Sequence, residues 1–191
     1  MKCLFLGYDK KKTRLITLLE RKGILVKNIK RDLKKNDLNK YDLYISFGYR
    51  KIIPQKYLKI LRKPIINLHL SYLPYNKGSH PNYWSFVENT PSGVTIHEIT
   101  RGVDQGPILF QKKIYFDHKK NKNLTFKSSH QLLFQEIENL FEKKLILILK
   151  KKYKKKIQKK IYSFHNKKDL PKNLKNWNTK IFSYLKKLKD G

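Results

Sequence analysis

The chain has 191 residues, of which 39% are hydrophobic, so it is long enough to bury the core of one domain with a short extension. Its single cysteine, Cys3, excludes an intramolecular disulfide framework and is typical of a reducing compartment. The longest aliphatic run (145–149) is too short to span a membrane, and the first apolar run is too short for a signal peptide. We therefore expect a soluble, cytoplasmic protein with no membrane partner.

The formal net charge of +31 would attract nucleic acid, an acidic membrane surface or an anionic small substrate. The sequence contains 39 Lys but only 6 Arg, and Arg is the residue favoured for bidentate recognition of phosphates and bases. Lys, Asn and Ile are abundant together, which is typical of an A/T-rich coding sequence. This composition makes nucleic acid an unlikely partner, although the basic charge does not exclude it.

The first part of the chain alternates short apolar runs with helical or polar connections. This order predicts βαβ units and an α/β fold with a mostly parallel sheet flanked by helices. In such sheets ligands bind beyond the carboxyl ends of the strands. We expect strands over 2–7, 24–29, 42–47 and 64–67, helices over 10–22 and 54–61, and a loop or frayed helix over 31–40.

The second part continues with a helix over 82–88, a strand over 93–99 and another strand over 108–116. The tight turn between these strands reads T-R-G-V-D-Q-G-P, and its two glycines permit a backbone that most residues could not adopt. Apolar residues recur on one helical face from 123 to 149. We expect that long helix to pack on the sheet.

The residues after position 150 form a basic run with interspersed aromatic residues, K-K-K-Y-K-K-K-I-Q-K-K-I-Y-S-F-H. Such a run could be a nucleic-acid surface, but we favour a short hairpin that caps the domain with its lysines in solvent. A final amphipathic helix over 177–188 would pack either on the domain or on a second subunit of a homodimer. We accordingly divide the chain into a catalytic domain, 1–150, and a C-terminal hairpin and helix extension, 151–191.

Three polar residues stand at predicted strand ends or turns: Asn67, His69 and Asp104. Asn67 and His69 are two positions apart, so on a strand they share a face. The amide could stabilise an oxyanion, the imidazole could accept a proton, and a carboxylate would orient the ring. The alternative is a polar strand end with a structural histidine. No nucleophile-elbow or zinc spacing is present, which favours direct transfer between two substrates without a metal.

These residues lie in two motifs, N-L-H-L-S-Y-L-P-Y-N-K-G-S-H-P and G-V-T-I-H-E-I-T-R-G-V-D-Q-G-P-I-L, which resemble the folate-dependent formyltransferases. The resemblance covers about 41–114 and includes S-F-G-Y-R-K-I-I-P, similar to the pterin-pocket segment of that family.

The resemblance implies a Rossmann-like formyltransferase fold, 10-formyltetrahydrofolate as donor, and catalytic roles for Asn67, His69 and Asp104. His97 matches a second family histidine, although a core-facing strand residue is an equal alternative. The residues that the resemblance places around the pterin are Phe47, Gly48, Tyr49, Arg50, Lys51, Ile52, Gly102 and Val103.

Differences between this sequence and the individual groups of the family reduce the number of candidate acceptor substrates. G-Y-D-K-K-K-T lacks the glycine-rich phosphate loop of glycinamide ribonucleotide transformylase, and the residues after 149 are too few for the second domain of a methionyl-tRNA formyltransferase. L-P-Y-N-K-G resembles the loop of the sugar N-formyltransferases, with Lys where Arg is usual. The acceptor-side candidates are Tyr75, Asn76, Lys77 and Trp84.

The resemblance thus favours a nucleotide-linked amino sugar, with dTDP as the first carrier, in lipopolysaccharide O-antigen biosynthesis. Three alternatives remain: methionyl-tRNA, glycinamide ribonucleotide, and a non-catalytic RNA-binding protein on a formyltransferase scaffold.

Overall fold

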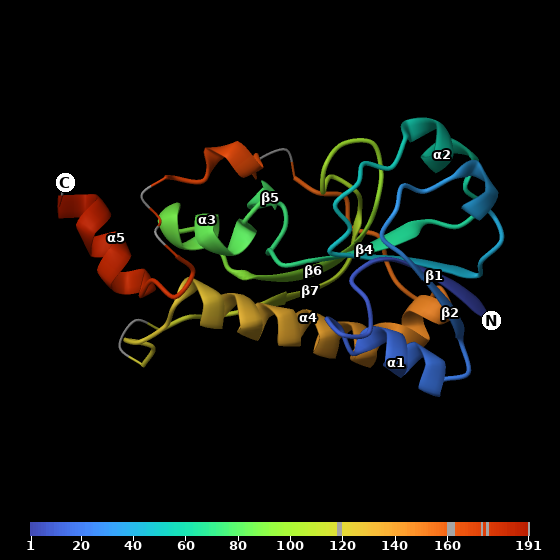
Figure 1. Cartoon of the computed structure of the whole chain (residues 1–191), viewed down its shortest axis with the longest axis horizontal. Coiled ribbons are helices and arrows are strands. Elements are labelled where there is room, and N and C mark those ends of the chain that lie inside the picture. The colour runs from blue at the N-terminus through green and yellow to red at the C-terminus, as the bar shows by residue number, and fades with distance from the viewer. Residues whose placement is uncertain (118–119, 160–162, 173, 175, 191) are drawn as a thin grey trace.

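A six-stranded sheet forms the centre of the computed structural model, which describes residues 1–117, 120–159, 163–172, 174 and 176–190 (Figure 1). Its strand order is β2-β1-β3-β4-β6-β7, and the first four of these strands run parallel to one another. The two remaining strands are antiparallel: β6 to β4, and β7 to β6. The predicted mostly parallel α/β fold is therefore confirmed. The strands are β1 (Lys2–Gly7), β2 (Leu25–Ile29), β3 (Leu43–Phe47), β4 (Ile65–His69), β6 (Gly93–Glu98) and β7 (Ile108–Lys113).

Alternate residues of each strand point to opposite faces of the sheet, so both faces carry apolar side chains, and both are covered. On one face, α1 (Leu15–Arg21) and the long helix α4 (Phe126–Leu149) bury the larger apolar cluster (Figure 1). On the other face, α2 (Gln55–Ile60) and the loop that contains the short helix η1 (Lys35–Asp37) bury a second cluster. β1 shows this alternation: Cys3 and Phe5 belong to the first cluster, and Leu4 and Leu6 belong to the second.

Three predicted helix starts were too early by three residues or more, and one of them is the C-terminal helix, which was expected from residue 177 and begins at Ile181. The helix expected from residue 10 begins at Leu15, because the backbone folds into a turn in which Asp9 O accepts the N–H groups of Lys12 and Thr13. The helix expected from residue 123 begins at Phe126, because Thr125 caps it: Thr125 Oγ1 accepts the Ser128 N–H at 3.0 Å. Helix starts depend on such capping contacts more than on apolar spacing.

The start of α1 is tied to α4 through Glu138, which is buried. Its Oε1 accepts the Thr13 hydroxyl at 2.6 Å and the Arg14 backbone N–H at 3.1 Å. Arg14 Nε lies 3.4 Å from the other carboxylate oxygen. A buried carboxylate is stable only when paired in this way, so Glu138 links the two helices on this face.

Two strand bounds also differ from the prediction. The strand expected over 64–67 continues to His69, whose Cα pairs with Thr95. The strand expected over 108–116 ends at Lys113, because its pairing partner β6 begins at Gly93. Strand length is set by the neighbouring strand, which the residue pattern of one strand does not contain.

The chain after α4 does not pair with itself as the predicted hairpin would, so far as the structure describes it. Lys156 forms an antiparallel bridge with Ile108, and β8 (Phe164–His165) pairs in parallel with β5 (Lys77–Gly78). The described parts of this segment therefore pair with β7 and with β5. Residues 160–162 of the predicted hairpin lie outside the described residues.

The C-terminal helix α5 (Ile181–Asp190) follows a short helix, η2 (Lys167–Asp169), and lies at one end of the molecule (Figure 1). Its Ile181 and Tyr184 pack with Tyr83 of α3 (Pro81–Val87) and Phe126 of α4 in a third apolar cluster. Of the two predicted placements, packing on the domain is the one observed. No helix within the described ranges is long and apolar enough to cross a bilayer.

Candidate active site

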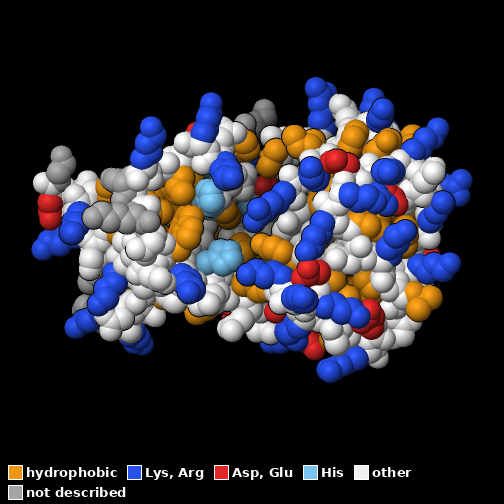
Figure 2. All heavy atoms as spheres, in the orientation of Figure 1, with side chains coloured by type: hydrophobic (Ala, Val, Ile, Leu, Met, Phe, Trp, Pro, Cys, Tyr) orange, Lys and Arg blue, Asp and Glu red, His pale blue; other side chains and the backbone are white. Residues whose placement is uncertain are grey.

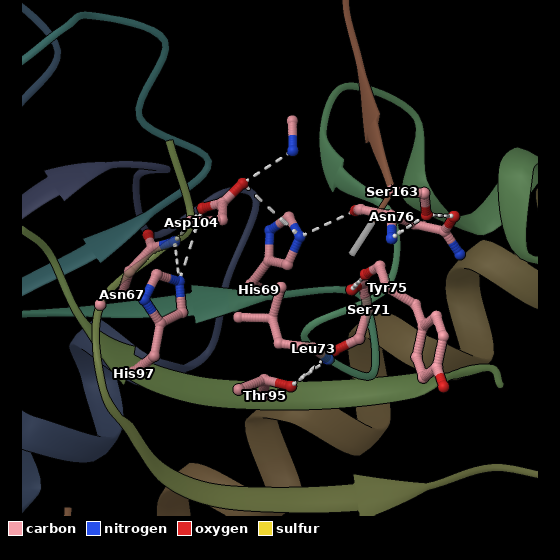
Figure 3. Close-up of polar contacts among 12 residues, drawn as sticks. Asn67, His69, Ser71, Leu73, Tyr75, Asn76, Thr95, His97, Asp104 and Ser163 are labelled. Carbon is pink, nitrogen blue, oxygen red and sulfur yellow. Dashed lines mark hydrogen bonds and ion pairs between the residues drawn. The ribbon is translucent and has the colours of Figure 1, made fainter. Parts of the chain in front are cut away.

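The predicted polar residues meet where β4, β6 and the β6–β7 turn come together (Figure 3). Asn67 and His69 lie on β4, and the Cα of Asn67 pairs directly with His97 on β6. Asp104 comes from the turn that follows β6. The structure therefore gathers all three predicted catalytic residues together with His97.

Asp104 stands at the centre of this group (Figure 3). Its Oδ1 accepts from Asn67 Nδ2 at 3.4 Å and lies 3.5 Å from His97 Nε2. Its Oδ2 accepts the Gly78 backbone N–H at 2.9 Å and lies 3.7 Å from His69 Nε2. One carboxylate thus contacts all the other polar groups of the site.

His97 is fully buried, yet its ring orients a site residue. Its Nδ1 lies 2.9 Å from the Glu98 carbonyl oxygen, which can only accept, so Nδ1 carries the hydrogen. In the neutral ring Nε2 is then an acceptor, and Asn67 Nδ2 donates to it at 3.1 Å. The two hydrogens of the Asn67 amide therefore point toward His97 and Asp104.

Burial and charge set the protonation states of the pair His69 and Asp104. Burial lowers the pKa of His69 below its ordinary value and the nearby His97 adds to this, while Asp104 partly offsets it. Burial opposes ionisation of Asp104, but the two histidines and the Gly78 N–H outweigh it and hold its pKa well below its usual range. Near neutrality the site thus presents a carboxylate and a neutral imidazole, which suits proton transfer.

The turn that carries Asp104 needs a glycine at position 106. A Cβ built there would lie 1.7 Å from the Glu98 carbonyl oxygen, so any side chain would push β6 and the turn apart. Asp104 itself has a positive φ of 52°, a conformation that costs a non-glycine residue roughly 1 kcal/mol or more. The turn is therefore held in a specific, strained shape.

A second loop, after β4, approaches His69 from the other side (Figure 3). The Asn76 carbonyl oxygen lies 3.4 Å from His69 Nε2. This loop is held against β6, where Thr95 Oγ1 accepts the Leu73 N–H at 3.1 Å and donates to the Ser71 carbonyl at 2.7 Å. The His69 imidazole is thus placed between a carbonyl and a carboxylate.

The pterin-side candidates lie at the end of β3 and within the β6–β7 turn, but not all their side chains point outward. Phe47 is buried with its ring 5.0 Å from that of Tyr8, and the Tyr49 hydroxyl donates to the Arg31 carbonyl at 2.9 Å. Ile52 and Val103 are instead 88% and 48% exposed, which is high for apolar side chains. The other pterin-side candidates are Gly48 and Gly102, both with positive φ, and the exposed Arg50 and Lys51.

The acceptor-side candidates are mostly covered by the chain itself. Asn76 and Lys77 are buried, and burial lowers the pKa of Lys77. The Trp84 indole stacks on the His165 ring with centroids 4.0 Å apart, and Tyr75 is half-buried. Within the described residues, no group of three or more His, Cys, Asp or Glu side chains could hold a metal ion.

Contacts from the C-terminal segment to this site were missed by the sequence analysis. Gln158 donates to the backbone of the Asp104 turn, and Ser163 contacts Asn76. Gln158 is the one uncharged polar side chain in the basic run 154–159, which is a faint signal in retrospect. Nothing local connects either residue to the site, because both contacts span more than fifty positions.

Comparison with known proteins bears directly on the nature of this site. A family model described as formyl transferase matches residues 11–137, which include all four polar residues of the site. The chain belongs to the formyl transferase family.

The formyltransferase PseJ from Anoxybacillus kamchatkensis has a structure solved with UDP-4,6-dideoxy-4-formamido-L-AltNAc and tetrahydrofolate. This chain is 38% identical to it, with a TM-score of 0.87, over 95% of this chain and 96% of PseJ. The methionyl-tRNA formyltransferase of Prochlorococcus marinus subsp. pastoris is 34% identical over 80% of this chain and 49% of its own length.

A dTDP-4-amino-4,6-dideoxyglucose formyltransferase from Mycobacterium tuberculosis is 36% identical over 40% of this chain and 32% of its own length. The chain thus spans less than half the length of the curated relatives it matches, whereas it is nearly coextensive with the PseJ structure. The family is therefore shared with enzymes that act on different acceptors.

Proposed function

We propose that the protein transfers a formyl group from 10-formyltetrahydrofolate to the amine of a nucleotide-linked amino sugar. The observation that carries this proposal is the Asp104 carboxylate, which joins Asn67, His69 and His97 in one buried group. The near-complete match to PseJ, whose structure holds a formamido sugar nucleotide, supports the choice of acceptor.

The donor supplies a formyl group on nitrogen, which the acceptor amine attacks at carbon, and tetrahydrofolate leaves. Asn67 Nδ2 would donate to the formyl oxygen as negative charge develops there. Its bond to Asp104 is long, at 3.4 Å, so one hydrogen can be redirected at little cost. One well-placed donor of this kind contributes roughly 3–4 kcal/mol to the transition state.

The proton of the attacking amine would pass to the His69 and Asp104 pair. His69 is neutral near pH 7 because burial lowers its pKa, so it can accept a proton. The imidazolium would then face the Asp104 carboxylate at 3.7 Å. That proton is available for return to the departing nitrogen, which balances the reaction without a covalent enzyme intermediate.

The segments 47–52 and 102–103 would hold the pterin. Ile52 and Val103 expose apolar side chains on these segments, and a planar ring would cover them favourably. Gly48 and Gly102 both have positive φ, which glycine adopts without strain, and the Tyr8 ring and the Gln105 side chain fill the space where their Cβ atoms would lie. The chain therefore fits a folate on chemical grounds.

The predicted Tyr75, Asn76, Lys77 and Trp84 would line or support the acceptor side. Figure 2 shows lysine and arginine side chains spread over this face of the molecule, with apolar and histidine side chains between them. With a net charge of +31, such a surface would draw in the diphosphate of a sugar nucleotide. The carrier is dTDP in the Mycobacterium tuberculosis relative and UDP in the PseJ complex, so both belong in the test.

We also propose the predicted setting, namely cytoplasmic synthesis of a sugar for lipopolysaccharide O-antigen or a related surface polysaccharide, by a homodimer. Nucleotide-linked formamido and amino sugars among the relatives support this setting.

The experiment is an acceptor panel with one donor. The protein is incubated with 10-formyltetrahydrofolate and, separately, with UDP-linked and dTDP-linked 4-amino sugars, glycinamide ribonucleotide and methionyl-tRNA. Mass spectrometry of each acceptor should show formylation of at least one amino sugar and of neither other acceptor. Formylation of the tRNA with an inert amino-sugar panel would overturn the proposal, and salt-dependent RNA binding without any transfer would favour a non-catalytic role.

A further inference from the structure

Two non-glycine residues with positive φ stand on opposite sides of His69. Asp104 has a φ of 52° and Asn76 a φ of 54°. This left-handed conformation is less favourable for residues that carry a Cβ, although Asp and Asn tolerate it best, so surrounding contacts help to hold it. Both residues contact His69: Asp104 through its carboxylate and Asn76 through its carbonyl. What holds these two backbones therefore also places the groups around the imidazole.

The Asp104 backbone is held by a side chain far along the chain. Gln158 Nε2 donates to the Asp104 carbonyl oxygen at 2.8 Å and to the Gly106 carbonyl oxygen at 2.7 Å. An amide nitrogen carries two hydrogens, so it can satisfy both carbonyls at once. Gln158 lies two residues after Lys156, whose pairing with Ile108 fixes this part of the chain.

The Asn76 backbone is held by the next part of the same segment. Ser163 Oγ accepts the Asn76 N–H at 2.8 Å and lies 2.9 Å from the end of the Asn76 side chain (Figure 3). The Ser163 carbonyl accepts the Lys77 N–H at 2.9 Å. This contact begins the β5–β8 pairing, which in turn places the Gly78 N–H that donates to Asp104.

We propose that Gln158 and Ser163 are positioning residues for formyl transfer, which hold the backbones of Asp104 and Asn76 so that the carboxylate and the carbonyl face His69. The inference rests on the proposed function. It places residues 156–158 and 163–165 among the residues that support the catalytic group and so moves the boundary of the catalytic part beyond the predicted residue 150. Neither side chain needs to touch a substrate for this role.

The test at Gln158 separates hydrogen-bond donation from packing. Gln158→Glu keeps the size but presents oxygens to two carbonyl oxygens, whereas Gln158→Lys keeps N–H donors, one bond further from the backbone on a flexible side chain. We expect kcat to decrease in the order wild type, Gln158→Lys, Gln158→Ala and Gln158→Glu, with Gln158→Lys within a few-fold of wild type. We expect a loss of about tenfold in Ala and about 10²-fold in Glu, since misplacement of about 1 Å can cost that much.

The effect should fall mainly on kcat, because both residues hold backbones whose polar groups face His69, and changes in KM should be smaller than changes in kcat. Ser163→Ala should lower kcat, and Ser163→Thr, which keeps the hydroxyl, should restore it. Lys154→Ala, an exposed neighbour in the same segment, is the matched control and should behave as wild type.

Thermal unfolding is measured for every variant, and the Lys and Thr variants keep the test valid where Ala or Glu does not fold. Equal kcat for Gln158→Glu and wild type, or equal losses in Gln158→Lys and Gln158→Ala, would overturn the inference. A wild-type protein that formylates no acceptor in the panel would instead overturn the proposed function, which distinguishes the two failures.

Discussion

Replacing Asp104 with asparagine removes one negative charge from the site while keeping the shape of the side chain. The carboxylate lies 3.7 Å from His69 Nε2 and 3.5 Å from His97 Nε2. At 3.7 Å, the attraction between a carboxylate and the imidazolium formed during transfer is about 4.5 kcal/mol at an effective dielectric constant of about 20. That energy corresponds to a loss of about 10³-fold in kcat, within the range expected for general acid–base groups.

The loss should appear in kcat, because the charge matters most after His69 has taken up a proton. The KM for 10-formyltetrahydrofolate should change by only about threefold or less. The assay is initial-rate formation of formylated sugar nucleotide, measured by chromatography under saturating donor. Asp190→Asn, which removes an exposed carboxylate at the end of α5, controls for the change in net charge and should leave kcat unchanged. An Asp104→Asn variant that folds and retains a third or more of wild-type kcat would refute the reasoning.

Three further predictions concern stability. Burial lowers the pKa of His69 below 6.5 in the folded protein. As the pH falls through 6.5, the unfolded chain therefore binds the proton before the folded protein does. The free energy of unfolding should fall more steeply below that pH in wild type than in His69→Gln, and parallel pH curves from chemical denaturation would contradict this. Gly106→Ala should lower the free energy of unfolding by more than about 2 kcal/mol and abolish activity, because its Cβ would lie 1.7 Å from the Glu98 carbonyl oxygen. Gly23→Ala, with positive φ but open space around it, should cost only about 1 kcal/mol, and equal costs would count against the steric explanation. Glu138→Gln should lower the free energy of unfolding, measured in urea, by about 1–3 kcal/mol and leave kcat unchanged, because it weakens the buried contacts between α4 and the start of α1. A decrease of less than about 0.5 kcal/mol would be inconsistent with that role.

The grouping of the proposed catalytic residues could be predicted from short local patterns in the sequence. Asn67 and His69 share a strand face at a spacing of two, and Asp104 lies in a turn marked by two glycines. Because β6 runs antiparallel to β4, the strand-end rule for parallel sheets does not by itself bring Asp104 to this pair; the turn after β6 does so through its contacts with Asn67 and His69. His97 was left open between a core residue and a site residue, and the structure shows it to be buried and also in contact with Asn67 and Asp104.

The contacts that hold this group could not be predicted in the same way. Gln158 and Ser163 lie 54 and 87 positions from the residues they contact, in a run dominated by lysine. The Gln158 contacts follow the single bridge between Lys156 and Ile108, and the Ser163 contacts precede the parallel pairing of β5 with β8, each only two residues long. Pairing of such short strands is decided by tertiary packing, and residue pattern carries almost no information about it.

Side-chain direction was a further limit at the pterin side. The sequence motif places 47–52 at the end of a strand, but Phe47 and Tyr49 turn toward the interior whereas Ile52 turns outward. The direction follows from which neighbours each ring meets: Tyr8 for Phe47, and the carbonyl of Arg31 for Tyr49. These neighbours come from the residue after β1 and from the loop after β2, and a motif read by itself does not contain them.

Direct transfer between two bound substrates is the central claim, and a single-turnover experiment with donor labelled by ¹³C at the formyl carbon tests it most directly. The protein in excess is mixed with labelled 10-formyltetrahydrofolate and the amino-sugar nucleotide that responds in the panel, and the reaction is quenched over time. The label should pass from folate to the sugar formamide at one rate, and intact-protein mass spectrometry should show no formylated protein at any time. Label on the protein before it reaches the sugar, or label released only as formate, would contradict the account.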